Sequence, residues 1–347
     1  MKRIITCSDG TWNDPEEKDE GQLAPTNVYI ISNLLANRDA AANTQVIHYH
    51  SGVGTTGGVL QKLNGGITGA GLDADIIDAY TFIVRNYEVG DLNYLFGFSR
   101  GAYTARSLAG FIVNCGILKL ENISKINDAY ALYRDRDPNS APWTAQAQAF
   151  RNTYSYPPAV QFIGVWDTVG ALGIPLEIFE SIDADKYKFH DTQLSSQVPF
   201  AYHALAADEH RQIFDATLWQ HNDTAAADNQ TIEQVWFAGA HRNVGGGYKD
   251  TGLSDYTLQW MVDKAKGTGL CFNETPDTYN TDVVDGALIN SDTLPWKILE
   301  HFEPFSRSIS VDDQQSVSPT IYQRIDGNSE YIPNIHLPPN PNVSPPV

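Results

Sequence analysis

Long apolar segments are absent from this chain of 347 residues. No stretch of about 18 apolar residues occurs, so the sequence predicts no transmembrane helix. The apolar run that follows Met1 ends after a few residues at the polar turn around Asp9, and it is too short for a secretory signal peptide. We therefore expect a protein of the cytoplasm, or one that is exported without a cleavable signal peptide.

Cysteine and basic side chains are scarce. The three cysteines lie far apart, and their spacing predicts neither a zinc site nor a disulfide framework: Cys7, Cys115 and Cys271. Lysine and arginine together number 23 against 42 acidic residues, which gives a formal net charge of −19. Because an acidic surface repels the phosphate backbone, we do not expect nucleic acid as a partner.

Sequence patterns for cofactors and metals are also absent. The glycine-rich stretch 65–71 has neither the G-x-G-x-x-G spacing of a dinucleotide site nor the lysine of a P-loop. No metal-ligand spacing relates the four candidate carboxylates, Asp9, Asp14, Asp208 and Glu209. We expect no cofactor and no bound metal.

Apolar runs alternate with segments of helical spacing, and 42% of the residues are hydrophobic. Strands are predicted at 3–7, 45–50, 93–96, 159–166, 211–219 and 234–239. Helices are predicted at 27–35, 72–87 and 102–112 and from Ser254 onward, whereas His203 is expected on a helix outside the strands. The alternation predicts an α/β fold with a mostly parallel central sheet flanked by helices.

The chain is long enough for one large domain. We expect that domain to span residues 1–335, with 120–157 and 171–232 as cap or insert segments. The proline-rich tail, 336–347, is expected at the surface.

One pentapeptide indicates chemistry. Residues 97–101 read G-F-S-R-G, at the end of a predicted strand and before a predicted helix. This is the context of a nucleophile elbow, in which the serine, here Ser99, stands at a strained turn. Side chains at Gly97 and Gly101 would collide with the joined strand and helix. A G-x-S-x-G pentapeptide also occurs by chance, so the prediction of a nucleophile depends on whether an acid and a base accompany Ser99.

Two partners follow in the chain order of α/β-hydrolases, which is Ser, then Asp or Glu, then His. Asp167 ends the next clear strand and His241 follows a later one, and His241 alone among the nine histidines combines a strand end with a glycine-rich exit. Asp167 has an alternative role, since its carboxylate is also suited to capping the following turn. The three residues together predict a serine hydrolase of α/β-hydrolase-like fold.

Such an enzyme needs two donors for the oxyanion of its tetrahedral intermediate. The residue after the nucleophile supplies one backbone N–H, here that of Arg100. The loop after the first strand is the candidate for the other, from Gly10 or Thr11.

Several motifs together resemble the catalytic domain of the type VI secretion phospholipase effectors. They are C-S-D-G-T-W-N at 7–13, P-T-N-V at 25–28, G-F-S-R-G-A-Y-T-A-R at 97–106, V-W-D-T-V-G at 165–170 and the segment 241–248. The resemblance extends from the first strand to about Pro333. It implies an α/β-hydrolase fold, a triad of Ser99, Asp167 and His241, and hydrolysis of lipid acyl esters.

Two departures from that family stand out. Asn243 occupies a position where the family usually has aspartate, which leaves Asp167 as the acid. The chain also lacks room for the large membrane-associating module of the toxic effectors.

The sequence therefore predicts a serine hydrolase that cleaves carboxylic esters, with lipid acyl esters as the expected class. The alternatives are a hydrolase-fold binding protein of weak catalysis, a secreted phospholipase-type toxin, and a metal-dependent hydrolase of phosphoesters or glycans. The oligomeric state stays open.

Overall fold

The computed structural model describes residues 1–10, 13, 15–52, 69–135, 137–170, 194–220, 230–273, 279–291, 305–309 and 315–338. Several predictions fall outside these ranges: Thr11, Asp14, residues 65–68 of the glycine-rich stretch, 171–193 and 221–229 of the second insert, and 339–347 of the tail.

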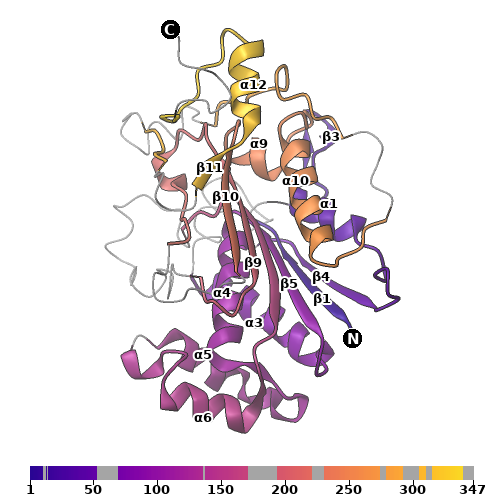
Figure 1. Ribbon diagram of the computed structural model, residues 1–347, viewed down its shortest axis with the longest axis vertical. Coiled ribbons are helices and arrows are strands. Elements are labelled where there is room, and N and C mark those ends of the chain that lie inside the picture. The colour runs from indigo at the N-terminus through magenta and orange to yellow at the C-terminus, as the bar shows by residue number, and fades with distance from the viewer. Residues whose placement is uncertain are drawn as a thin grey trace.

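The centre of the molecule is a seven-stranded sheet in which every neighbouring pair is parallel (Figure 1). Its strand order is β11-β10-β9-β8-β5-β1-β4. The strands are β1 (Arg3–Ser8), β4 (Gln45–His50), β5 (Leu92–Phe98), β8 (Val160–Trp166), β9 (Phe200–Ala206), β10 (Thr231–Phe237) and β11 (Gln315–Val317). The predicted parallel α/β architecture is confirmed.

Helices cover both faces of the sheet (Figure 1). Helices α3 (Gly69–Asn86) and α4 (Arg100–Cys115) lie on one face, and α1 (Asn27–Leu34) and α10 (Ser254–Gly267) lie on the other. Successive side chains of a strand point to opposite faces. Leu95 of β5 accordingly packs in the core beneath α3 and α4, and its neighbour Phe96 packs in the core beneath α1 and α10.

The remaining elements are short. Helix α9 (His241–Gly245) follows β10, and α12 (Pro319–Gly327) follows β11. Two small antiparallel pairs join β2 (Lys18–Asp19) to β3 (Gln22–Leu23) and β6 (Ile117–Leu118) to β7 (Ser155–Tyr156). The described residues also include three 3-10 helices: η1 (Leu120–Lys125), η2 (Pro138–Ser140) and η3 (Gln212–Phe214).

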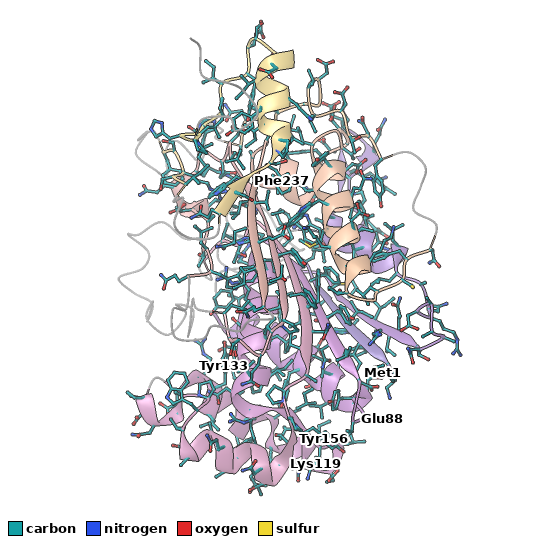
Figure 2. The ribbon with its side chains drawn as sticks, viewed as in Figure 1. Met1, Glu88, Lys119, Tyr133, Tyr156 and Phe237 are labelled. Atoms are coloured by element: carbon teal, nitrogen blue, oxygen red, sulfur yellow. The ribbon has the colours of Figure 1, made fainter. Side chains whose placement is uncertain are left out.

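Residues 120–157, predicted as a cap or insert, include helices α5 (Ile126–Arg134) and α6 (Ala145–Tyr154). The Tyr130 ring lies 5.4 Å from the Phe111 ring in the C-terminal half of α4. Figure 2 shows Tyr133 of α5 in the lower part of the view and Phe237, the last residue of β10, in the upper part. The segment therefore packs beside the C-terminal half of α4, whereas Ser99 precedes the first residue of that helix.

One predicted strand is wrong. Residues 211–219 contain only the short helix η3, and the strand between β8 and β10 is β9, which includes His203. Three alanines favour helix in β9 by propensity, but both faces of a central parallel strand are covered, so burial decides. The edge strand β11 was not expected at all. Among the described residues, no helix is long and apolar enough to span a bilayer.

Candidate active site

Ser99 stands at a strained turn between β5 and α4. Its backbone has φ 58° and ψ −122°, a conformation that non-glycine residues rarely adopt. A Cβ at Gly97 would lie 2.7 Å from Ala102 Cα, and one at Gly101 would lie 2.6 Å from the Asp9 carbonyl oxygen. Both glycines are therefore required by close backbone packing. Although Ser99 is the N-cap residue of α4, its hydroxyl does not cap the helix.

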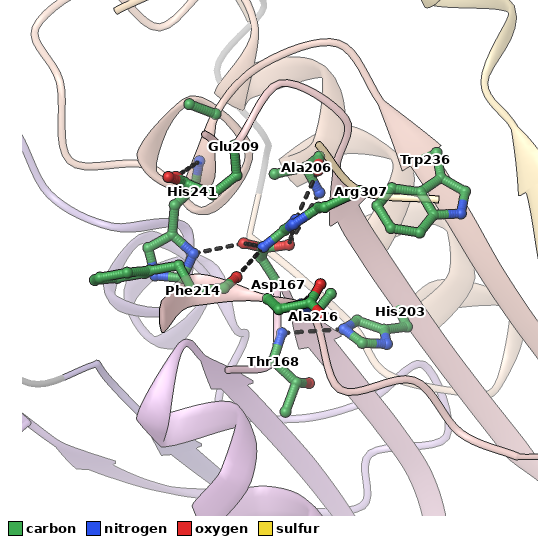
Figure 3. A network of polar contacts seen from close by, with 12 residues as sticks. Asp167, Thr168, His203, Ala206, Glu209, Phe214, Ala216, Trp236, His241 and Arg307 are labelled. Carbon is green, nitrogen blue, oxygen red and sulfur yellow. Dashed lines mark hydrogen bonds and ion pairs between the residues drawn. The ribbon is translucent and has the colours of Figure 1, made fainter. Parts of the chain in front are cut away.

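Asp167 and His241 form a buried pair at the carboxyl edge of the sheet (Figure 3). Asp167 Oδ2 lies 2.5 Å from His241 Nδ1. Asp167 directly follows β8, while His241 is the first residue of α9 and the fourth residue after the end of β10. With Nδ1 engaged by the carboxylate, Nε2 remains on the far side of the imidazole ring.

Packing around Phe98 brings this pair to Ser99. The Ser99 amide donates to the carbonyl of Trp166, the residue before Asp167, at 3.1 Å. The His241 ring lies 4.6 Å from the ring of Phe98, which precedes Ser99. A Cβ at Gly245 would overlap the Phe98 ring, so glycine there allows α9 to approach this closely. The three residues singled out in the sequence thus gather at one edge of the sheet.

The predicted oxyanion donors lie beside Ser99. Arg100 opens α4, where backbone N–H groups and the helix dipole favour an anion. A Cβ at Gly10 would be 2.9 Å from Ser99 Cβ, so the Gly10 backbone abuts the serine. The Gly10 N–H, however, donates to Asp9 Oδ1 at 2.7 Å in this structure. Thr11 lies outside the described residues, and the second donor stays a prediction.

The electrostatics of the pair keep the imidazole neutral and the carboxylate charged. Burial lowers the pKa of His241 below its usual value, against the raising effect of Asp167. Burial alone would raise the pKa of Asp167, but Arg307 and His241 hold it well below the usual range. His241 is therefore able to accept a proton at neutral pH and below.

Comparison with known proteins decides the family. The family described as "T6SS, Phospholipase effector Tle1-like, catalytic domain" matches residues 2–264. The chain belongs to this family. The match ends before Pro333, the limit that the motifs led us to expect.

Relatives of this Tle1-like domain are longer chains. A yeast protein from Saccharomyces cerevisiae, "Uncharacterized protein YEL023C", is 32% identical over 233 residues, covering 61% of this chain and 32% of its own length. An uncharacterized protein from Pseudomonas aeruginosa is 17% identical with a TM-score of 0.45, covering 79% of this chain and 48% of its own. A Tle1 effector bound to the VgrG spike is 20% identical with a TM-score of 0.42, covering 72% and 52%. The chain thus spans about a third to a half of these relatives.

Asn243, the departure from the Tle1-like pattern, has a structural role. Its Oδ1 accepts from the amides of Ala240 and Ile289, each at 3.3 Å, and its Nδ2 donates to the carbonyl of Ala287 at 2.8 Å. An aspartate would have no N–H for Ala287. The side chain therefore fastens α9 to residues 287–289.

Glu209 is a second anchor of α9. It pairs with Arg211 at 2.8 Å, and it accepts from the His241 amide at 3.2 Å and from the Ser291 hydroxyl at 2.8 Å. Burial would raise the pKa of Glu209, but Arg211 lowers it to about 2. No sequence motif predicted the contact with His241.

Arg307 is the residue of the site that sequence reasoning missed. Arg307 forms a two-point ion pair with Asp167 (Figure 3). It follows Asp167 by 140 positions and lies beyond residues 2–264, the range that the family matches. No motif surrounds it, so only the folded structure reveals the contact.

The candidate metal carboxylates that the structure describes are engaged by protein donors. Asp9 accepts from Thr26, Tyr49, Asn13 and the Gly10 amide. Asp208 accepts from Tyr331 and from the amides of Gly239 and Asn334. Within the described ranges, no three His, Cys, Asp or Glu side chains converge on a metal-sized site.

Proposed function

We propose that this Tle1-like domain is a serine hydrolase that cleaves carboxylic esters through Ser99, His241 and Asp167. The observation that carries the proposal is the strained Ser99 at the start of α4, beside a buried Asp167–His241 pair whose Nδ1–Oδ2 distance is 2.5 Å. Turn, helix and acid–base pair are the parts that nucleophilic catalysis by serine requires.

In the proposed reaction, His241 Nε2 takes the hydroxyl proton as Ser99 Oγ attacks the ester carbonyl carbon. The developing oxyanion is stabilised by the Arg100 N–H and by a donor of the loop after β1. The carbon–oxygen ester bond then breaks, and the alcohol leaves with the proton from His241. Water, deprotonated by His241, attacks the acyl-enzyme and releases the acid and free Ser99.

The acyl chain has a candidate site along α4. A pocket of about 290 Å³ is lined mainly by apolar side chains, including Ala109, Val113, Val198 and Trp219. Residues seven apart lie on nearly the same face of an α-helix, so Arg106 at its near end follows Ser99 by two turns, about 10 Å. An apolar pocket in this position favours an ester with a long alkyl chain, as in lipids.

Helix η3 and the segment after it link this pocket to the Asp167–His241 pair. The Phe214 ring lies 5.0 Å from the His241 ring. Five residues later, Trp219 lines the pocket, with the guanidinium of Arg106 at 4.9 Å from its ring. Arg106 also donates to the carbonyls of Thr217 and Leu218, which holds this segment against α4.

A fluorophosphonate probe and a short p-nitrophenyl ester test the proposal. We expect the probe to label Ser99, as located by peptide mass spectrometry, and we expect Ser99→Ala to lose both labelling and turnover by a factor of about 10³ or more. Ser124→Ala, at an exposed serine of η1, is the matched control and should retain both. Wild-type turnover in the Ser99→Ala protein would refute the mechanism.

The same assay separates the alternatives. A hydrolase-fold binding protein would neither turn over esters nor react with the probe. A metal-dependent hydrolase would lose its activity with a chelator and keep it in Ser99→Ala.

A further inference from the structure

We propose that Arg307 is a positioning residue of the active site, which fixes the Asp167 carboxylate and sets the proton affinity of His241. The inference rests on the proposed function, and it extends the site into a segment beyond the family match of residues 2–264.

The contact with Asp167 has two points. Arg307 Nη1 donates to Oδ1 at 2.6 Å, and Nη2 donates to Oδ2 at 3.1 Å. Oδ1 also accepts from the Ala206 amide at 3.0 Å, and Oδ2 faces His241 Nδ1 at 2.5 Å. A fork of this kind fixes the plane of the carboxylate, and hence the direction in which Oδ2 meets the imidazole.

Arg307 is itself held rigidly. Its side chain is only 1% exposed, and it donates to the carbonyls of Ala206 and Phe214 as well as to Asp167 (Figure 3). Arg307 also forms an isolated parallel β-bridge with Ile335, near the end of the described residues. The arginine thus joins the end of β9, the end of η3 and the C-terminal region at one carboxylate.

Charge balance gives this contact its effect on the base. Asp167 and Arg307 neutralise each other while His241 is uncharged, so protonation of His241 leaves a net positive charge in a buried place. Nη2 of Arg307 and Nδ1 of His241 share the oxygen Oδ2, so the two cations would stand close together. A like charge at such short range opposes protonation of the imidazole.

Other charges near the pair are also fixed. Arg211 opposes and Glu209 favours protonation of His241. Around Arg307, Asp215 and Glu209 add negative charge, and buried His203 senses both Asp167 and Arg307. Arg307 is the positive group among them that touches Asp167 directly, so replacing it removes the cation in contact with this carboxylate.

Two substitutions separate charge from geometry. Arg307→Met removes both, and Arg307→Lys keeps the positive charge but loses the planar fork. The protonation midpoint of His241 is measured by NMR on full-length protein with labelled histidine, and kcat and KM are measured with a p-nitrophenyl ester across pH. Circular dichroism establishes that each variant is folded.

We expect Arg307→Met to raise the His241 midpoint by about one pH unit or more, and to move the acid limb of kcat/KM with it. Arg307→Lys should leave the midpoint near that of the wild type, while kcat falls about tenfold or more at little change in KM. An unshifted midpoint in folded Arg307→Met would overturn the proposal.

If Arg307→Met does not fold, Arg307→Lys decides, because wild-type kcat in that variant would equally overturn the positioning role. The NMR titration needs no turnover. Absence of esterase activity in the wild-type protein would therefore refute the proposed function. An unshifted His241 titration in Arg307→Met would refute the role of Arg307.

Discussion

Ser99 combines chemistry and backbone strain in one residue. Its φ of 58° belongs to a region that L-residues occupy at a cost of about 1–3 kcal/mol, which the surrounding packing must offset. The Gly10 backbone on one side and Trp166 on the other hold the residue there. A glycine at this position has no Cβ to oppose the turn.

We therefore predict that Ser99→Gly is more stable than Ser99→Ala by about 1 kcal/mol, as measured by urea unfolding. Ser107, within α4, supplies the matched control, because glycine in a helix interior is less favourable than alanine by about 1 kcal/mol. Equal stability of the two Ser99 variants, or an alanine variant that is the more stable, would contradict stored strain at the turn.

Local patterns predicted some residues of the site and not others. Ser99, Gly97 and Gly101 belong to one pentapeptide whose geometry is dictated by the strand and helix on either side. Asp167 and His241 each follow a strand, so their order along the chain was informative. Arg307 has no neighbouring motif, and its contact depends on how the C-terminal segment folds back over β9.

At the scale of elements, strands were predicted correctly where burial on both faces of the sheet is accompanied by a mainly apolar run in the sequence. Strands β1, β5 and β8 are mainly apolar runs with turn residues after them, and all three were predicted. Strand β9 reads F-A-Y-H-A-L-A, with a histidine and three alanines, and its position was assigned instead to residues 211–219. The His203 ring lies in the interior, where its Nε2 accepts from the Thr168 amide at 3.1 Å.

The pocket along α4 predicts a preference for esters with long acyl chains. Ala141, between η2 and α6, lines the pocket and is partly exposed, so a larger side chain there fills space without entering the core. We expect Ala141→Trp to lower the ratio of kcat/KM for long-chain over short-chain p-nitrophenyl esters by about tenfold, since each lost methylene contact is worth about 1 kcal/mol.

Ala145→Trp is the matched control for this prediction. Ala145 begins α6, is exposed and does not line the pocket. It should keep the wild-type chain-length profile. Identical profiles in wild type and in Ala141→Trp would place the acyl chain elsewhere, although the esterase activity itself would stand.

At the scale of the whole molecule, buried titratable groups affect how stability responds to acid. Burial, with a further contribution from Arg106, lowers the pKa of His203 to about 3, from an ordinary value of 6.5. Glu209, with its pKa lowered to about 2, titrates in the unfolded chain only near 4.5. These two groups therefore act in different pH windows.

The sign follows from proton uptake. Between pH 6.5 and about 3, the unfolded chain protonates residue 203 and the folded protein does not, so the stability that neutral His203 contributes is lost as the pH falls. At pH 5 the loss is about 2 kcal/mol, for 1.5 pH units at about 1.4 kcal/mol each. The lowered pKa of His241 acts in the same direction, while Asp9, raised by burial to about 6, acts in the opposite one.

We predict that His203→Gln, which keeps an acceptor for the Thr168 amide, reduces the loss of unfolding free energy between pH 7 and pH 5 by about 2 kcal/mol. Glu209→Gln is the contrast, because its own contribution is lost only below about pH 4.5. Glu209 favours protonation of His241, so its removal acts on this interval only through a further lowered His241 pKa and should not reduce the loss. Wild type and His203→Gln share the formal charge of −19, so its relief in acid cancels in the comparison of these two proteins. Urea titrations at pH 7 and pH 5 measure the unfolding free energies. An equal loss between these pH values in wild type and His203→Gln would show that His203 protonates in the folded protein as readily as in the unfolded chain.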